Sequence, residues 1–279
     1  MSLLSSILLG LIQGLAEFLP ISSSGHLAIA EHFLGQAGIP ATPDFFDVLL
    51  HLGTLVAVFV AYWQDIREMV VELIDGIRDL AHGTTPNPIP PARRLILLII
   101  VATLPLFAVL PVKDLVEALS GNIYFVAGAL IVTGFLLFAS DRVKKGRKTE
   151  KNATLVDVLL VGVAQAIATC PGISRSGTTI TAGCFVGFDR KFAVRFSFLM
   201  SIPAILGANL LTLIDAIQEN TIIVSDIPVY LVGVAVAAVV GYACIRLLKM
   251  IADKGKFGWF AYYCWTAGLI VLALTLVLG

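Results

Sequence analysis

Six stretches of this chain are apolar over the length that a helix needs to cross a lipid bilayer, about 20 residues. The chain has 279 residues, of which 58% are apolar and only 14% are charged, whereas a soluble domain carries about 45–50% and about 25%. This composition excludes a soluble enzyme, a disordered chain and a secreted disulfide scaffold. It predicts an all-α polytopic membrane protein with six transmembrane helices. The expected spans are 45–63, 93–111, 122–140, 192–214, 227–248 and 259–278.

Charge and cysteine usage exclude other classes of protein. The 19 basic and 19 acidic residues balance, so no overall positive field favours nucleic acid as a partner. The four cysteines lie in apolar stretches without paired spacing and are expected to be buried free thiols. The first basic residue is Arg67, so the N-terminal stretch lacks the positive region of a cleavable signal.

Two further apolar regions, 2–36 and 154–187, are interrupted by polar residues. The interruptions run from Pro20 to His26 and from Pro171 to Gly177. Irregular backbone of this kind cannot face lipid, because its amides and carbonyls would remain unpaired. We therefore expect two re-entrant helical hairpins, whose tips lie inside the membrane.

The charges of the loops predict how the spans are oriented. The segment 141–151 holds six Lys or Arg residues, whereas 215–226 holds three acidic residues and no base. Basic loops stay cytoplasmic, so 141–151 is expected inside, with both termini external. Hairpin 2–36 then enters from outside and hairpin 154–187 from inside. Trp63 and Trp259 are expected to be interfacial anchors.

The two interrupted regions resemble each other. Residues 10–35 laid over 162–187, at an offset of 152, give ten identities in 26 positions. Self-similarity predicts a repeat, here a single membrane domain, 1–279, with inverted halves at about 1–140 and 152–279. Such repeats place a binding site near the midplane, where the halves meet. The alternative is that common packing rules produced two similar Gly/Ser hairpins.

The polar residues of the two tips are the candidates for chemistry. Charged residues inside a membrane suggest a function and a partner, and Glu17 and Arg175 are the expected partners if the tips meet. His26 can move a proton, and a neighbouring serine is a nucleophile if His26 reaches it; helix capping is the alternative role for these serines. Arg175 and free backbone N–H groups suit phosphate, whereas a purely structural ion pair is the alternative. Asp47 and His51 are expected at most to flank the cavity. The candidates are Gln13, Glu17, Ser22, Ser23, Ser24, Gly25 and His26 at the first tip, and Ser174, Arg175, Ser176, Gly177, Thr178 and Thr179 at the second.

At these tips the sequence resembles the undecaprenyl-diphosphate phosphatase family, the proteins tied to bacitracin resistance. The resemblance rests on two motifs, Gln13 to His26 and Pro171 to Thr179, and on the span layout. It implies hydrolysis of undecaprenyl diphosphate to undecaprenyl phosphate and inorganic phosphate, which recycles the lipid carrier for cell-wall synthesis. It also implies a bacterial plasma (inner) membrane location, a site open to the outer face, and a divalent cation, Mg²⁺ or Ca²⁺.

Carried over position by position, the resemblance makes Glu17, Ser23, His26 and Arg175 the catalytic candidates. Ser174, Ser176 and Thr179 become phosphate contacts. Many family members carry Glu where this chain has Gln13, and others carry Gln. Because Gln cannot ionise, Glu17 is at most the one carboxylate that binds the cation at this tip, and Gln13 offers a neutral oxygen.

Several alternatives stay open. Either Ser23 attacks the phosphate while His26 handles the proton, or His26 or Glu17 activates a water directly. A secondary transporter or flippase for polyprenyl phosphate is the rival function, because inverted repeats also build transporters. The lipid substrate and the bilayer are the expected partners, and a homodimer is open.

Overall fold

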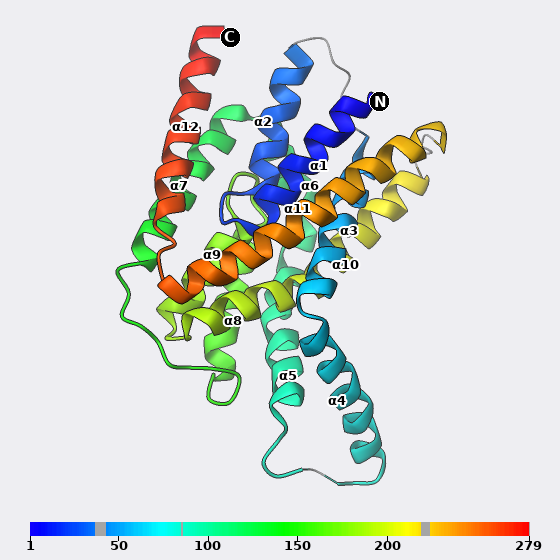
Figure 1. Ribbon diagram of the computed structural model, residues 1–279, viewed down its shortest axis with the longest axis vertical. Helices are drawn as coiled ribbons and strands as arrows, with labels where there is room; N and C mark the ends of the chain where they lie inside the picture. The colour runs from blue at the N-terminus through cyan, green and yellow to red at the C-terminus, as the bar shows by residue number, and fades with distance from the viewer. Residues whose placement is uncertain (37–42, 85, 219–223, 279) are drawn as a thin grey trace.

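The structure, a computed structural model, is all-helical in the part of the chain that it describes, residues 1–36, 43–84, 86–218 and 224–278. Figure 1 shows the helices packed into one elongated bundle. The α-helices are α1 (Leu3–Phe18), α2 (Ser23–Gln36), α3 (Asp44–Ala61), α4 (Trp63–Ala81), α5 (Pro91–Thr103), α6 (Lys113–Ala118), α7 (Ile123–Ser140), α8 (Leu155–Ile167), α9 (Arg175–Phe185), α10 (Arg190–Gln218), α11 (Ile227–Lys254) and α12 (Trp259–Leu278). Short 3₁₀ helices are η1 (Leu104–Ala108), η2 (Leu110–Val112), η3 (Leu119–Gly121) and η4 (Val224–Asp226).

In the described part of the chain, five segments are long and apolar enough to cross a membrane, and a bent pair of helices brings the number to six. This confirms a multi-pass membrane protein. The five segments coincide with the expected spans other than 45–63. They are Pro91–Gly121, Ile123–Ser140, Arg190–Gln218, Ile227–Ala252 and Trp259–Val277.

The span expected at 45–63 ends earlier and is followed by a helix that the sequence analysis did not predict. α3 stops at Ala61, and α4 leaves at an angle of 84°. Tyr62 has non-helical backbone angles at the bend. Lys249 on α11 holds this corner, since its Nζ donates to the Ala61 carbonyl at 3.0 Å and lies 3.6 Å from the centroid of the Tyr62 ring.

The span expected at 93–111 keeps regular α-helical geometry only as far as Thr103. Pro105 and Pro111 lie in the 3₁₀ segments that follow. Proline lacks the amide hydrogen that an α-helix needs and clashes with the preceding turn. The segment therefore continues as η1, η2 and α6 up to Gly121.

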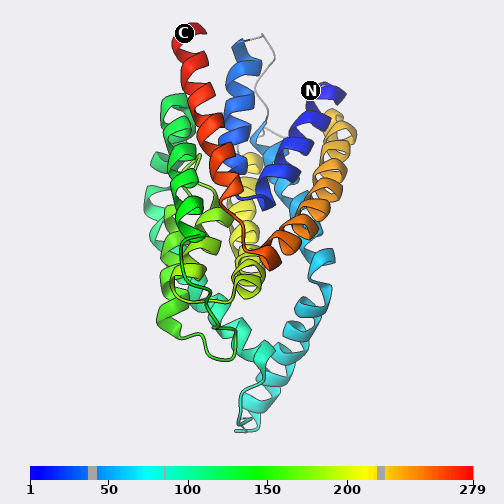
Figure 2. The same cartoon turned by 60° about the vertical axis from the view of Figure 1, so that its left-hand side comes forward.

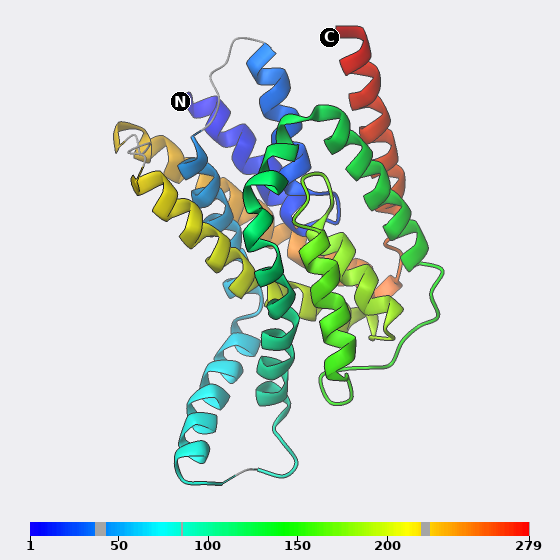
Figure 3. The ribbon, with the colours of Figure 1, turned by 180° about the vertical axis from the view of Figure 1, so that it is seen from behind.

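The interruptions between α1 and α2 and between α8 and α9 lie together near mid-height of the bundle (Figures 1 and 3). α1 begins at the end of the molecule that carries both termini, and α8 begins at the opposite end, near the segment 141–151 (Figures 1 and 2). α1 packs along α11, and α8 packs along α5. The contact with α11 is close, because a Cβ at Gly10 would collide with the carbonyl of Gly233.

The apolar core lies under the two interruptions and fixes their position. Phe18, the last residue of α1, is fully buried and packs edge-on against Phe198 of α10, with ring centroids 5.5 Å apart. All four cysteines are free thiols, and Cys184, Cys244 and Cys264 are buried, as the sequence predicts, whereas Cys170 is only partly buried. The core thus locks the end of α1 in place, immediately before the first polar tip.

Candidate active site

The first tip is a short, sharply turned connection between α1 and α2. Ser22 is buried and has a φ of 73°, a left-handed conformation that is costly for a residue with a side chain. Its hydroxyl accepts a hydrogen bond from the amide of Gly25 at 3.2 Å. Ser22 therefore caps α2 and turns the chain so that Ser23 begins the new helix at the tip.

The second tip repeats this cap on α9. The Ser174 hydroxyl accepts from the amide of Gly177 at 3.1 Å, three residues ahead as in the first tip. Thr133 of α7 fastens the connection, since its hydroxyl donates to the Gly172 carbonyl at 3.2 Å and accepts from the Ser174 amide at 3.0 Å. Gly172 itself has a φ of 88°, which glycine alone adopts readily.

The two tips touch each other through equivalent residues. A Cβ placed on Gly25 would lie 2.9 Å from the Cα of Gly172. A Cβ on Gly177 would lie 3.2 Å from the Cβ of Pro20. At the offset of 152, Gly25 corresponds to Gly177 and Pro20 to Gly172, so the contact is reciprocal. The N-termini of α2 and α9, each with unpaired amides, therefore meet at one place in the bundle.

Glu17 is the centre of the polar network between the tips. Its side chain is 4% exposed and forms an ion pair with Arg175. Its other carboxylate oxygen accepts from the Ser23 hydroxyl at 2.6 Å and from Nε2 of Gln13 at 3.1 Å. The expectation that Glu17 and Arg175 would pair is confirmed. A buried carboxylate is tolerated here because Arg175, Ser23 and Gln13 all donate to it.

His51 of α3 completes the surroundings of Glu17. Its Nε2 lies 3.9 Å from Oε2 of Glu17, and its Nδ1 donates to the Asp47 carbonyl at 2.8 Å. The carbonyl can only accept, so the neutral ring carries its proton on Nδ1. His51 thus belongs to the cluster itself, which is closer than the flanking position expected from the sequence.

Among the described hydrogen bonds, none joins His26 to Ser23. Its Nδ1 donates to the Ser22 carbonyl at 2.8 Å, which leaves Nε2 to accept from the hydroxyl of Tyr263 on α12 at 2.8 Å. The two rings stack with centroids 5.6 Å apart and planes 15° from parallel. The serine–histidine pair considered from the sequence is therefore absent, and Ser23 is hydrogen-bonded to Glu17 instead.

The hydroxyls of the second tip are largely engaged within the protein. Ser176 donates to the Leu19 carbonyl of the first tip at 3.4 Å, and Thr179 lies 2.6 Å from the hydroxyl of Ser197 on α10. The hydroxyl of Thr178 is buried without a hydrogen-bond partner. Ser24 is exposed, 3.4 Å from the Ser22 hydroxyl. These side chains hold the tips together, and the backbone amides of α2 and α9 are the groups left for an anion.

A family model for the bacitracin resistance protein BacA matches residues 6–270 of the chain. The chain belongs to the BacA family. Its relatives are similar over their whole length. An undecaprenyl-diphosphatase from Syntrophotalea carbinolica is 42% identical over 276 residues, which cover 99% of this chain and 100% of that protein. One from Methanosphaera stadtmanae is 39% identical over 285 residues and 100% of both chains. The resemblance drawn from the two motifs is confirmed.

Oxygen ligands for a divalent cation are present in this BacA-family site. Among the described residues, no three His, Cys, Asp or Glu side chains group as a metal site. However, the amide oxygen of Gln13 is buried without a hydrogen-bond partner, beside the Glu17 carboxylate. Mg²⁺ is commonly bound by one or two carboxylates together with substrate phosphates. These two side chains fit a cation of that kind.

Three residues around the BacA-family site were not among the sequence candidates, and a fourth, His51, was expected only to flank the cavity. The three are Thr133 of α7, Ser197 of α10 and Tyr263 of α12, which contact Ser174, Thr179 and His26. Each is a polar residue inside an apolar helix, where a polar side chain usually faces other protein groups. That signal was available for His51, but it does not identify the partner.

Proposed function

We propose that the chain is an undecaprenyl-diphosphatase, which hydrolyses undecaprenyl diphosphate to undecaprenyl phosphate and inorganic phosphate. This would recycle the lipid carrier of cell-wall synthesis and confer bacitracin resistance. The names of the full-length relatives support the substrate. The observation that carries the proposal is the contact of Ser23, Glu17 and Arg175 where the N-termini of α2 and α9 meet. A nucleophile, a base and an anion site occur together there.

In the proposed reaction the diphosphate competes with Glu17 for Arg175. The guanidinium and the amides of both helix ends bind the terminal phosphate and stabilise the charge of the transition state. Glu17, relieved of its ion pair, accepts the proton of Ser23, whose Oγ bonds to the terminal phosphorus while the bridging P–O bond breaks. Undecaprenyl phosphate leaves as the anion. The hydrogen bond of 2.6 Å between Ser23 and Glu17 supports this choice of base.

Water then hydrolyses the phosphoserine. His26 lies one helical turn from Ser23. Its Nδ1 is bound to the Ser22 carbonyl, so its Nε2 takes the proton, after water has replaced the Tyr263 hydroxyl there. Water donates its proton there, its oxygen bonds to phosphorus, and the Ser23 oxygen leaves with a proton from Glu17. Inorganic phosphate is released, and His26 returns its proton to solvent.

We also propose Gln13 and Glu17 as the ligands of a divalent cation, Mg²⁺ or Ca²⁺. A bound cation would neutralise part of the charge of the diphosphate. The partnerless amide oxygen of Gln13 supports this assignment.

Phosphate release by purified protein in detergent tests the proposed function. We expect release from undecaprenyl diphosphate, its loss when a chelator removes divalent cations, and its recovery on adding Mg²⁺ or Ca²⁺. A transporter or flippase would release no phosphate in a micelle, since it needs two compartments. Absence of release in the presence of both cations would reject the phosphatase.

We also propose that α1–α2 and α8–α9 are the two re-entrant hairpins of an inverted repeat. The reciprocal contacts of Gly25 with Gly172 and of Gly177 with Pro20 support it, because a two-fold relation makes equivalent residues exchange partners. Equivalent helix packing supports it too, since α1 lies on α11 and α8 on α5.

The proposed orientation places both termini outside the cell and the segment 141–151 inside. The termini and this basic segment lie at opposite ends of the bundle (Figure 2).

Single cysteines near Asp114 and Glu219, the latter outside the described residues, are expected to react with an impermeant thiol reagent in intact cells. A cysteine at Lys145 is expected not to react. A background with Cys170 replaced by Ser removes the one native cysteine that is not buried. External labelling at position 145 would overturn this orientation.

Tyr263 is expected to position His26. Tyr263→Phe keeps the stacked ring and removes the hydroxyl that donates to Nε2. Since one hydrogen bond contributes about 1 kcal/mol, we expect kcat to fall about fivefold with KM unchanged. The matched control is Tyr242→Phe, which changes a partly buried tyrosine on α11. Equal rates for Tyr263→Phe and the unmodified protein would contradict this role.

A further inference from the structure

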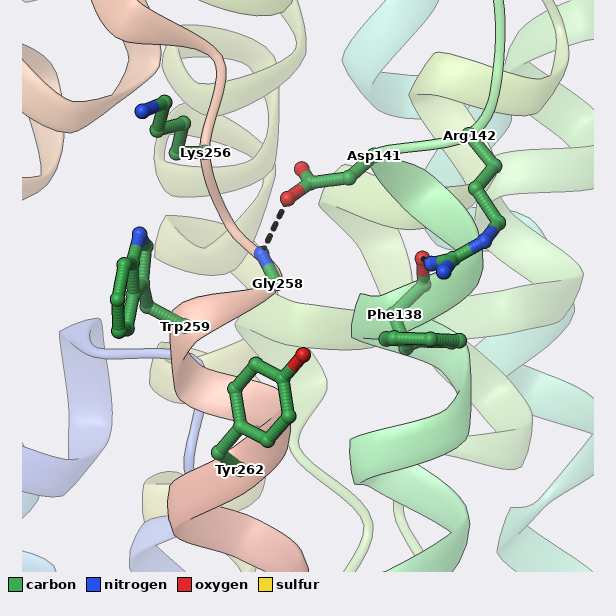
Figure 4. A pocket seen from close by; sticks show the side chains of 7 residues that line it. All are labelled: Phe138, Asp141, Arg142, Lys256, Gly258, Trp259 and Tyr262. Carbon is green, nitrogen blue, oxygen red and sulfur yellow. Dashed lines mark hydrogen bonds between the residues drawn. The ribbon is translucent and has the colours of Figure 1, made fainter.

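A hollow of about 330 Å³ lies where α7 ends and α12 begins. Figure 4 shows side chains from both helices and from the preceding loop around it. Because the spans Ile123–Ser140 and Trp259–Val277 end and begin here, the hollow lies at the edge of the bilayer, at the level of lipid headgroups. Its lining consists of Phe138, Asp141, Arg142, Lys256, Gly258, Trp259 and Tyr262.

The one carboxylate of the hollow is used inside the protein. Asp141 accepts from the amides of Phe257 and Gly258 at 2.9 and 2.7 Å, and its charge is paired with Arg190 at 3.3 Å. Figure 4 shows its hydrogen bond to Gly258. Asp141 therefore shapes the loop before α12 and does not neutralise the cations that line the hollow.

Two cations remain, one on each side. Arg142 donates to the Phe138 carbonyl at 2.9 Å, and its guanidinium carbon lies 3.3 Å from the centroid of the Phe138 ring. This holds the guanidinium in place while leaving most of its donors unused. Lys256 is exposed. Among the described side chains, no ion pair includes Arg142 or Lys256, so the hollow carries two uncompensated positive charges.

Aromatic side chains form the wall that continues toward the bilayer. Trp259 is 72% exposed and Tyr262 is 56% exposed, and such residues prefer the interface between headgroups and acyl chains. Exposed apolar side chains follow along the same two helices, at Phe135 and Val132 of α7 and at Leu269 and Ile270 of α12. A molecule bound here would have its charged end at the cations and its apolar end along these helices.

We propose that the hollow binds the headgroup of an anionic membrane phospholipid. The phosphate lies between Arg142 and Lys256, and the acyl chains follow Tyr262 and Phe135. Paired cations with adjacent interfacial aromatics suit an amphiphile that carries a phosphate, and basic sites at the ends of spans are where anionic lipids are recognised. Free phosphate would use the two cations but not the aromatic wall. The site is separate from the tips and does not depend on the proposed enzymatic function.

Binding of short-chain phosphatidylglycerol with a spin-labelled acyl chain tests the proposal on the full chain in detergent. The lipid is expected to quench the fluorescence of Trp259, one of three tryptophans. Trp259→Phe is expected to reduce this quenching to the part that comes from Trp265, which packs against Phe135. Each basic residue adds about fivefold to the affinity for anionic lipid. We therefore expect the double variant Arg142→Gln with Lys256→Gln to bind about thirtyfold more weakly.

The control variant Lys144→Gln with Lys145→Gln removes the same charge from exposed residues nearby that do not line the hollow. We expect it to weaken binding much less. An equal loss would mean diffuse attraction and would overturn the site. Equal binding of labelled phosphatidylcholine, or full displacement by inorganic phosphate, would also overturn it. Should the double variant fail to fold, Lys256→Gln alone gives the same test, with about fivefold weaker binding expected.

Discussion

Arg175→Ala is expected to lower phosphate release from undecaprenyl diphosphate by about 10²–10³-fold, the effect of removing one charged donor that stabilises the transition state in a site of low dielectric constant. The protein is expected to remain folded, because Glu17 keeps the hydrogen bonds from Ser23 and Gln13 when Arg175 is gone. The measurements are the rate of phosphate release and the melting temperature in detergent.

Arg175→Lys separates charge from geometry. Lysine keeps the positive charge but lacks the planar fork that binds two phosphate oxygens. We expect a rate between those of the Ala variant and the unmodified protein.

A purely structural role for Arg175 predicts a different result. The ion pair with Glu17 is buried, with exposures of 18% and 4%. If its only role were stability, Arg175→Ala would leave an unpaired buried carboxylate and lower the free energy of unfolding by about 3–5 kcal/mol. Adding Glu17→Gln would then restore stability. Recovery of both stability and substantial activity in the double variant would refute the phosphate-binding role.

The position of the site could be predicted from the sequence because its signals are local. Pro20 and Pro171 interrupt apolar stretches too short to continue as spans, and the serines that follow cap new helices. A charged residue inside a membrane needs a partner of opposite charge. Glu17 at one tip and Arg175 at the other can therefore be predicted to pair from the sequence alone.

What could not be predicted depends on how the helices pack around the tips. His51 and Tyr263 reach Glu17 and His26 from α3 and α12, and no spacing in the sequence specifies that approach. The bend after Ala61 could not be predicted for the same reason, because the residue that stabilises it, Lys249, lies far along the chain. The serine–histidine pair considered from the sequence failed for a related reason, because Nδ1 of His26 is bound to its own turn.

A comparison of equivalent positions in the two tips, at the offset of 152, shows that they supply different functional groups. Ser23 and Arg175 stand at equivalent positions of the proposed repeat, and both side chains contact the Glu17 carboxylate. One half therefore supplies a hydroxyl, and the other supplies a cation at the matching place. Thr169 is the counterpart of Glu17, so the second half lacks the carboxylate that we propose as the base, and the proposed reaction has one centre.

Glu17→Gln is expected to give the other large effect, a loss of about 10²–10⁴-fold in kcat, the usual contribution of a general base. Glutamine has nearly the same shape. Its carbonyl oxygen can accept from Arg175 while its NH2 group donates to the Ser23 hydroxyl, but it cannot take the proton of Ser23. Phosphate release and the melting temperature are the measurements, and we expect the melting temperature to change little.

Gln13→Glu is the matching variant at the neighbouring position. It replaces the amide that donates to Glu17 at 3.1 Å with a second carboxylate, so the two acids repel each other unless a cation lies between them. We expect activity to be retained with Mg²⁺ or Ca²⁺ and to fall more steeply on chelation than in the unmodified protein. Near-normal turnover of Glu17→Gln would reduce Glu17 to a structural partner of Arg175. A chelation response in Gln13→Glu no steeper than that of the unmodified protein would place the cation elsewhere.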